Sequence, residues 1–416
     1  MLERIRNSRA NKIWIFLAVL GPGIITAMAD NDGPGIATYS VVGARYGYKL
    51  LWMLLLITFS LAVTQEMGAR IGMVTGKGLG GLIREKFGLK LSFLAMSAVL
   101  VANLGTTIAE FAGVAAAMEI FGVHKWISVP IAALLVVFLI NKADYRKVRT
   151  VFLFSAIIYI VYVISGFLAH PDWTQAARST FIPSFEFSRG YLVAFIAVVG
   201  TTITPWGQFF IQSYVVDKHL DIEHLNYERA DVFFGAFVTD FIAFFIMVAC
   251  AATLFVAGQH IASAEQAAVA LVPLAGRFAS GLFAIGLLNA SILAASILPL
   301  SSAYATAEAF GWEAGIDRSF TEARNFYILY SFFIIVSALI VMIPRVTLIS
   351  IIFISQTING ILLPVILIYV LKIINDEEIM GDYVNGPVFN TIAWGTVGFI
   401  IAVTVALLAA TLLGFA

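Results

Sequence analysis

The segment ADNDGPG, residues 29–35, interrupts a long apolar stretch near the start of the chain. It follows WIFLAVLGPGIITAM, residues 14–28, and precedes IATYSVVGARYGY, residues 36–48. Glycine and proline weaken or break a helix, and charged side chains are costly in the middle of a membrane. The stretch therefore predicts a membrane-spanning helix that is broken at its centre and carries polar groups at the break.

The composition indicates an integral membrane protein. Of the 416 residues, 61% are hydrophobic and 12% are charged, whereas a soluble domain is about half apolar and about a quarter charged. Lys plus Arg and Asp plus Glu balance at 25 each, so no basic surface suggests nucleic acid as a partner. The single cysteine, Cys250, excludes an intrachain disulfide framework and a C-x-x-C metal site.

Apolar runs of helical length recur along the chain. A membrane-spanning helix needs about 20 apolar residues, and eleven runs meet that need, at residues 13–43, 49–68, 89–121, 126–141, 150–169, 190–216, 231–257, 281–307, 325–343, 346–372 and 388–415. They are not the short alternating segments of a β-barrel. We therefore predict an all-α integral membrane protein with eleven transmembrane helices.

The distribution of Lys and Arg predicts the orientation. Basic residues gather in MLERIRNSRANK at residues 1–12, in the segment at residues 70–90 and in NKADYRKVR at residues 141–149. Short basic loops stay on the cytoplasmic side. We therefore expect a cytoplasmic N-terminus and, after eleven spans, an extracellular C-terminus.

The sixth span is also broken, by GTTITPWGQ at residues 200–208. Two Gly/Pro-interrupted spans at matching positions of two halves point to a midplane substrate site in transporters. Because the breaks are five spans apart, the two halves have inverted topology. We expect a first five-helix repeat at residues 13–169, a second at 190–372 and a final helix at 388–415, after the basic N-terminus.

The first break offers two carboxylates, Asp30 and Asp32. An intramembrane carboxylate is expensive and marks a functional site by default. The alternative is that one of these residues caps the following half-helix, and we expect this of Asp30 or Asn31 rather than Asp32. The sixth span offers oxygen donors, although some hydroxyls there merely bond back to the helix; these residues are Thr201, Thr202, Thr204, Gln208 and Gln212.

Other polar residues lie in the middle of predicted spans. Glu110 in TTIAEFAG and Asp240 in FVTDFIAFF are further buried acids, and Gln356 in ISQTING is a neutral amide. Asp240 and Gln356 have the alternative role of bonding neighbouring helices together. Glu110 has the alternative role of an internal hydrogen-bond anchor or a residue of a proton route.

All of these candidate ligands carry oxygen. The only sulfur near the broken segments is Met28, and no histidine falls in the core of a predicted span. Carboxylate, carbonyl, hydroxyl and water ligands suit Mg²⁺, Ca²⁺ and Mn²⁺, whereas thioether and imidazole favour later transition metals.

The chain resembles the Nramp family of divalent metal transporters over nearly its whole length. The resemblance rests on GPGIITAMADNDGPGIATYSVVGARYGYKLLW in span one, QEMGARIGMVTGKGL after span two, TTIAEFAG in span three and ISQTINGILLPVILIYVLKIINDEEIMGDYVN in span ten. It implies the inverted-repeat fold of LeuT-type symporters, in which spans 1–5 form the first repeat and spans 6–10 the second. Spans 1 and 6 are broken at mid-membrane, and span 11 follows the second repeat.

The resemblance also implies a metal site with departures from the family pattern. The family motif D-P-G-N is here Asp32-Gly33-Pro34-Gly35, so the metal-binding aspartate is kept and the asparagine is lost. The family motif A-x-x-M-P-H is here Thr201 to Trp206, so the backbone-ligand alanine becomes Thr201 and the soft methionine becomes Thr204.

Residues that the family links to proton movement are also replaced. Trp206 and Gln212 stand where the family has histidines in span six, and Thr107 stands where span three has an aspartate. Glu110 is kept, and Gln356 matches a glutamine that approaches the metal in the family.

The replacements resemble those of the bacterial Nramp-related magnesium transporters. We therefore expect metal contacts from Asp32, Thr204, Thr201, Glu110, Gln356 and Asp30, and transport of Mg²⁺, and also Mn²⁺, by alternating access without proton coupling. Mg²⁺ dehydrates reluctantly, and short threonines leave room for a partly hydrated ion. The alternatives are a proton-coupled Mn²⁺ or Fe²⁺ transporter with a divergent site, a divalent cation channel and, last, a membrane enzyme.

The remaining expectations follow from the same interpretation. We expect a multi-pass protein of the cell inner membrane whose partners are the lipid bilayer and divalent metal ions. We expect no enzyme activity, no obligatory protein partner and no cofactor, with Mg²⁺ or Mn²⁺ as the transported substrate.

Overall fold

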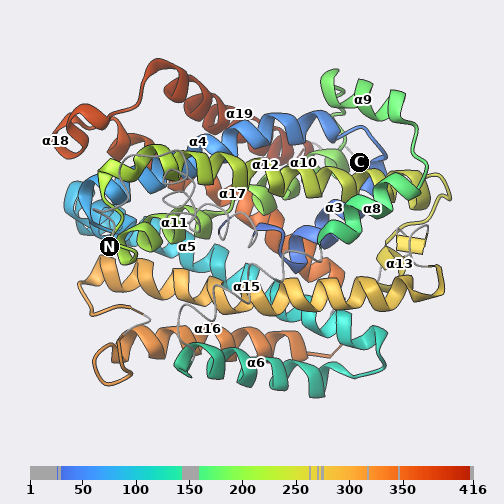
Figure 1. Ribbon diagram of the computed structural model, residues 1–416, viewed down its shortest axis with the longest axis horizontal. Helices are drawn as coiled ribbons and strands as arrows, with labels where there is room; N and C mark the ends of the chain where they lie inside the picture. The colour runs from blue at the N-terminus through green and yellow to red at the C-terminus, as the bar shows by residue number, and fades with distance from the viewer. Residues whose placement is uncertain are drawn as a thin grey trace, which may run out of the picture.

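The computed structural model describes residue 26 and residues 30–142, 159–261, 264–268, 271–272, 276–315, 318–344 and 347–412. Within these residues the regular structure is entirely helical (Figure 1). The α-helices are α3 (Gly33–Tyr46), α4 (Leu51–Thr75), α5 (Leu79–Ile120), α6 (Lys125–Lys142), α8 (Ile160–Leu168), α9 (Trp173–Phe181), α10 (Arg189–Thr202), α11 (Pro205–Asp217), α12 (Leu225–Cys250), α13 (Ala264–Ala268), α15 (Ala279–Phe310), α16 (Arg324–Met342), α17 (Leu348–Ile374), α18 (Glu377–Met380) and α19 (Pro387–Leu412).

Eight helical segments in the described part of the chain are long and apolar enough to cross a membrane. They coincide with predicted spans two, three and six to eleven, and the shorter apolar helix Lys125–Phe138 corresponds to span four. Predicted spans one and five, residues 13–43 and 150–169, fall partly outside the described residues, and the basic segment 1–12 lies entirely outside them. The count of eleven, the two repeats and the orientation therefore stay predictions.

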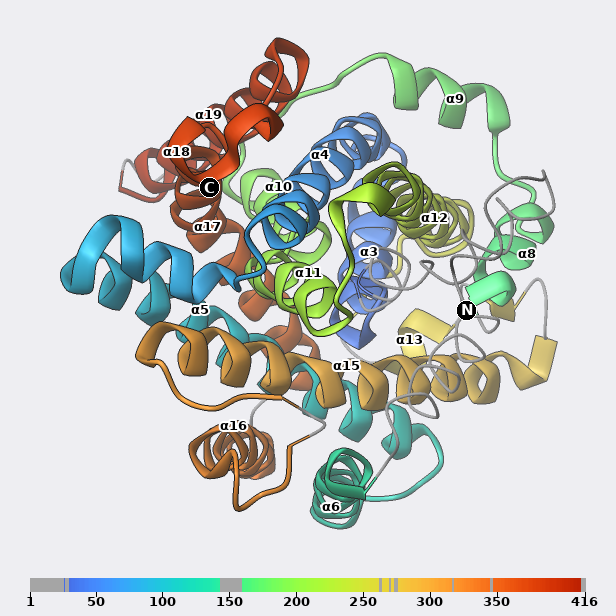
Figure 2. The ribbon, with the colours of Figure 1, turned by 60° about the vertical axis from the view of Figure 1, so that its left-hand side comes forward.

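The helices α3, α10 and α11 lie at the centre of the bundle (Figure 2). They are surrounded by α4, α12, α17, α5 and α15, and α11 is buried along nearly its whole length. The helices α6 and α16 form an outer layer against α5 and α15. The two predicted breaks therefore lie in the middle of the protein.

Small residues allow the central helices to approach closely. A methyl group on Gly200 of α10 would lie 2.1 Å from the Gln356 carbonyl oxygen of α17. A methyl group on Gly360 would lie 2.3 Å from the Ile196 carbonyl oxygen. Such contacts are typical of helix packing in membranes, where small side chains let backbones touch. They hold the helix that ends at the second break tightly against α17.

The third span begins earlier than predicted. The expected span 89–121 is part of α5, which starts at Leu79 and bends at Gly88, where φ is 74°. Glycine adopts this conformation without a steric cost. The segment before the bend is helical because its apolar side chains Leu79, Leu82 and Ile83 are buried.

The outer helices expose large apolar side chains. Phe332 and Leu339 of α16, Leu134 of α6 and Leu408 of α19 are all more than half exposed. Helices that are apolar on their outer as well as their inner faces are typical of membrane proteins.

Candidate ion site at the two helix breaks

The break in the sixth span falls where Pro205 stands. The helix α10 ends at Thr202, Ile203 and Thr204 are not helical, and α11 begins at Pro205. Proline lacks a backbone N–H and pushes the preceding residue into an extended conformation. Thr204 has φ −84° and ψ 142°, and its hydroxyl accepts a hydrogen bond from the Gly207 N–H at 3.2 Å. The predicted break is confirmed, and Thr204 is the N-cap of α11.

The break in the first span ends at Asp32. This residue is extended, with φ −70° and ψ 177°, and α3 begins at Gly33. One carboxylate oxygen, Oδ1, accepts from the Gly35 N–H at 2.6 Å. The expectation that Asp30 or Asn31 is the cap is therefore wrong. Pro34 favours the first turn of the helix, which leaves the cap position to Asp32.

Asp32 and Glu110 bring two carboxylates together. Glu110 of α5 lies directly beside Asp32, next to Gly33 and Ser291. Both acids are at most 1% exposed. Asp32 Oδ2 and both Glu110 oxygens make no hydrogen bond of normal geometry among the described residues, and the polar groups nearest to Glu110 are Asp32, the Gly33 N–H and the Ser291 hydroxyl. Two adjacent buried carboxylates with few donors are costly, so this pair is a strong candidate to hold a cation.

Gly33 allows α3 to pass between α5 and α15 at this point. A methyl group on Gly33 would lie 1.9 Å from the Ser291 hydroxyl oxygen and 3.4 Å from Glu110 Oε2. The Ser291 hydroxyl also lacks a hydrogen-bond partner within the described chain. Ser291 was not among the predicted residues, although it is a polar residue in the middle of an apolar span.

Neutral oxygens converge beside the same helix end. A methyl group on Gly35 would lie 2.9 Å from the Asp30 carbonyl oxygen, 3.0 Å from Asp32 Oδ1 and 3.4 Å from the Thr201 hydroxyl oxygen. The Thr201 hydroxyl has no hydrogen-bond partner in the part of the chain described. A residue without a side chain at position 35 thus leaves room among a carbonyl, a carboxylate and a hydroxyl, which are the ligand types that hard cations prefer.

Asp30 differs from Asp32 because its side chain is already held by donors. The Thr204 hydroxyl donates to Asp30 Oδ1 at 3.2 Å, and the Gln65 amide donates to Oδ2 at 3.1 Å. This contact joins the two breaks directly, since Asp30 precedes α3 and Thr204 caps α11. Gln65, on α4, was not singled out from the sequence.

Asn31, between the two acids, is also fixed by its neighbours. Its side-chain amide donates to the Thr239 carbonyl oxygen of α12 at 3.3 Å. Its backbone carbonyl oxygen accepts from the Tyr159 hydroxyl at 2.6 Å. The backbone of the first break is therefore anchored on both sides of its acids.

Gln356 lies in a separate polar layer. Its amide donates to the Ser355 hydroxyl at 3.2 Å, and its side-chain oxygen accepts from Asn359, which also donates to Thr106. The described contacts thus join five of the six predicted residues and leave the Gln356 side chain bonded within α17. The link to α5 is made by Asn359 through Thr106, and the contact of Gln356 with the ion stays a prediction.

A cation here would not be surrounded by charged ligands. Among the described residues, no group of three His, Cys, Asp or Glu side chains is arranged to hold a metal. An ion between the breaks would therefore take two carboxylates, neutral protein oxygens and water.

Known proteins are similar to this chain in sequence and in fold. Residues 23–410 match the profile of the family described as natural resistance-associated macrophage protein-like, Nramp. A divalent metal cation transporter MntH of Granulibacter bethesdensis is 25% identical over 97% of this chain and 90% of its own length. A transporter of the same name from Deinococcus radiodurans is 28% identical over 93% of this chain and 88% of its own length.

Solved structures agree on the architecture. The manganese transporter of Eremococcus coleocola, in complex with an aromatic bis-isothiourea substituted compound, superposes with a TM-score of 0.76 at 20% identity, covering 97% of this chain and 88% of that one. MhsT in complex with L-phenylalanine gives a TM-score of 0.60 at 12% identity, covering 94% and 98%. At these identities the likeness shows the fold alone, and it supports the predicted LeuT-type architecture.

Proposed function

Because this chain belongs to the Nramp family, we propose that it carries divalent metal ions across a membrane by alternating access, with Mg²⁺ as the main substrate and Mn²⁺ also carried. The observation that supports this best is the meeting of Asp32, Glu110, Thr201 and the Asp30 carbonyl oxygen at two helix breaks. In this proposal those groups contact the ion or its water shell, and Asp30 and Thr204 shape the site.

The chemistry of the donors favours Mg²⁺. Every group at the candidate site presents oxygen, and Mg²⁺ is bound through one or two carboxylates while it keeps several waters. Thioether sulfur would favour softer ions, and the described contacts of Asp30 and Asp32 involve none. The second candidate is Mn²⁺ as the main ion, which the printed name of the Eremococcus coleocola protein favours.

The cation class is tested by Thr204→Met. The substitution removes the hydroxyl that donates to Asp30 and caps α11, and it brings a thioether to the break. We expect Cd²⁺ and Mn²⁺ uptake to rise relative to Mg²⁺. Loss of the cap should also cost about 1 kcal/mol of stability.

Thr204→Val is the matched control, because it loses the same cap without adding sulfur. Initial uptake rates of the three ions are compared in proteoliposomes. An unchanged Mg²⁺:Mn²⁺:Cd²⁺ ranking in Thr204→Met, or the same change in both variants, would contradict a role of this position in selectivity.

We further propose that transport is not coupled to protons. Trp206, Gln212 and Thr107 stand at the positions linked to proton movement in the family, and none of them titrates near neutral pH. Gln212 donates to the Lys77 carbonyl oxygen at 2.8 Å, and Thr107 donates to that of Asn103 at 2.7 Å. The membrane potential supplies about 2.3 kcal/mol per charge per 100 mV, and therefore about twice that for a divalent ion.

Proton coupling is tested with proteoliposomes that contain a pH dye. A Mg²⁺ gradient is imposed, and valinomycin with K⁺ clamps the voltage. We expect Mg²⁺ entry without acidification beyond that of empty liposomes, and a protonophore added at the end shows that the dye responds. Acidification that follows Mg²⁺ entry would overturn the uncoupled mechanism.

A further inference from the structure

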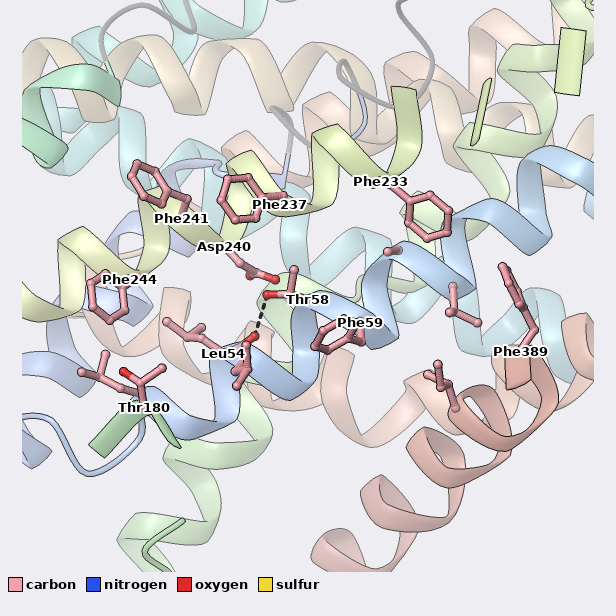
Figure 3. A pocket seen from close by; sticks show the side chains of 15 residues that line it. Leu54, Thr58, Phe59, Thr180, Phe233, Phe237, Asp240, Phe241, Phe244 and Phe389 are labelled. Atoms are coloured by element: carbon pink, nitrogen blue, oxygen red, sulfur yellow. Dashed lines mark hydrogen bonds between the residues drawn. The ribbon is translucent and has the colours of Figure 1, made fainter. Parts of the chain in front are cut away.

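A pocket of about 550 Å³ lies on the side of the bundle (Figure 3). It is formed by α4 and α12, with contributions from α9 and α19. Its walls are almost entirely apolar and rich in phenylalanine; the lining includes Phe59, Phe233, Phe237, Phe241, Phe244 and Phe389. The rings of Phe237 and Phe241 are stacked with their centroids 5.7 Å apart.

One charged group, Asp240, faces this pocket. Its side chain comes from α12 and points between the phenylalanines towards Thr58 of α4 (Figure 3). Asp240 is 4% exposed, and neither carboxylate oxygen has a hydrogen-bond partner among the described residues. The Thr58 hydroxyl is a polar neighbour of this carboxylate, and its proton is donated to the Leu54 carbonyl oxygen at 2.8 Å.

An intramembrane carboxylate calls for a partner. No Lys, Arg or His is found among the described residues that line the pocket. The described lining therefore supplies no positive charge for Asp240, and a cation that enters the pocket would supply one.

The surroundings select the kind of cation. A divalent metal ion needs about six oxygen ligands, whereas this pocket offers one carboxylate and apolar walls. An organic ammonium group on an aromatic or alkyl body matches both features, since aromatic faces attract cations and apolar walls bury the body. A volume of about 550 Å³ is enough for such a molecule.

We propose that this pocket binds a lipophilic organic ammonium ion, with the ammonium group on Asp240 and the apolar body among the phenylalanines. The site is separate from the ion site but adjoins it. Thr239, the residue before Asp240, accepts the hydrogen bond from Asn31, which stands between Asp30 and Asp32. A molecule bound at Asp240 therefore lies next to the segment that anchors the first break.

Dansylcadaverine, a fluorophore on a five-carbon chain that ends in a primary amine, is a suitable probe. Its neutral counterpart, N-pentyl dansylamide, lacks the amine. Both are titrated against the full chain in zwitterionic lipid nanodiscs, and the signal of empty nanodiscs is subtracted. We expect saturable binding of the amine at least about tenfold tighter than that of the neutral probe. Asp240→Asn should weaken the binding of the amine by about tenfold and change the affinity for the neutral probe by no more than about twofold.

Two further variants make the test decisive. Ala62→Phe fills the pocket and keeps Asp240, so it should weaken both probes even if Asp240→Asn does not fold. Phe234 lies on α12 outside the pocket and is 54% exposed, so Phe234→Leu should bind as the wild type does. Equal affinity of the wild type for both probes would overturn the proposal and indicate a groove for lipid chains. Amine binding that is unaffected by both Asp240→Asn and Ala62→Phe would overturn it as well.

Discussion

Asp32→Ala is expected to reduce Mg²⁺ uptake to the level of empty liposomes. Asp32 stands at the end of the first break, and its Oδ2 has no hydrogen-bond partner among the described residues. Without this carboxylate, a divalent ion would meet a single unengaged carboxylate, that of Glu110, because the Asp30 oxygens are already held by Thr204 and Gln65. The remaining opposite charge would then be too small to offset the energetic cost of a doubly charged ion at mid-membrane, so the ion would not bind.

The cap role of Asp32 requires a control for folding. Asp32 Oδ1 accepts from the Gly35 N–H, so alanine also loses an N-cap, at a cost of about 1 kcal/mol. Asp32→Asn keeps a good N-cap and removes only the charge. We expect both variants to be expressed and to elute as the wild type does, and both to lose uptake. Near-normal transport by Asp32→Asn would remove this carboxylate from the site.

Glu110→Gln is expected to weaken the apparent affinity for Mg²⁺ by about tenfold or more. The substitution keeps the volume of the side chain and removes a charge next to Asp32. A charge-assisted contact is worth about 1.5–3 kcal/mol, and about 1.4 kcal/mol corresponds to tenfold. The measurement is the concentration dependence of initial uptake rates in proteoliposomes.

Glu228→Gln is the matched control for this experiment. Glu228 is also a fully buried acid, but it lies in the first turn of α12, away from the two breaks. We expect its replacement to leave the apparent affinity within about twofold of the wild type. If Glu110→Gln behaved like this control, Glu110 would be an internal anchor without a charge role.

The positions of the two breaks could be predicted because they depend on local chemistry. Pro205 ends one helix and starts the next whatever surrounds it, and Pro34 lies in the first turn of α3 in the first span. The choice of the cap was wrong because composition alone does not distinguish Asp30, Asn31 and Asp32. The register of Pro34 in the first turn of α3 decides it.

Residues that meet the breaks from other helices were harder to predict. Ser291 and Gln65 reach the acids only through the packing of α15 and α4 against the centre. Gln356 is predicted from the family resemblance to approach the ion; its side chain is bonded to Ser355 and Asn359, and the ion contact stays a prediction. Asp240 was identified as a buried acid, whereas the pocket it faces depends on four helices and has no signature within one span.

The central claim is that this chain carries Mg²⁺, and it is tested most directly by Mg²⁺ uptake into proteoliposomes that contain a Mg²⁺ dye. Mn²⁺, Ca²⁺ and Fe²⁺ are added outside in turn as competitors, and liposomes with Asp32→Asn serve as the blank. We predict saturable Mg²⁺ entry that Mn²⁺ reduces by competition. Absence of Mg²⁺ entry from vesicles that accumulate Mn²⁺ would contradict the claim.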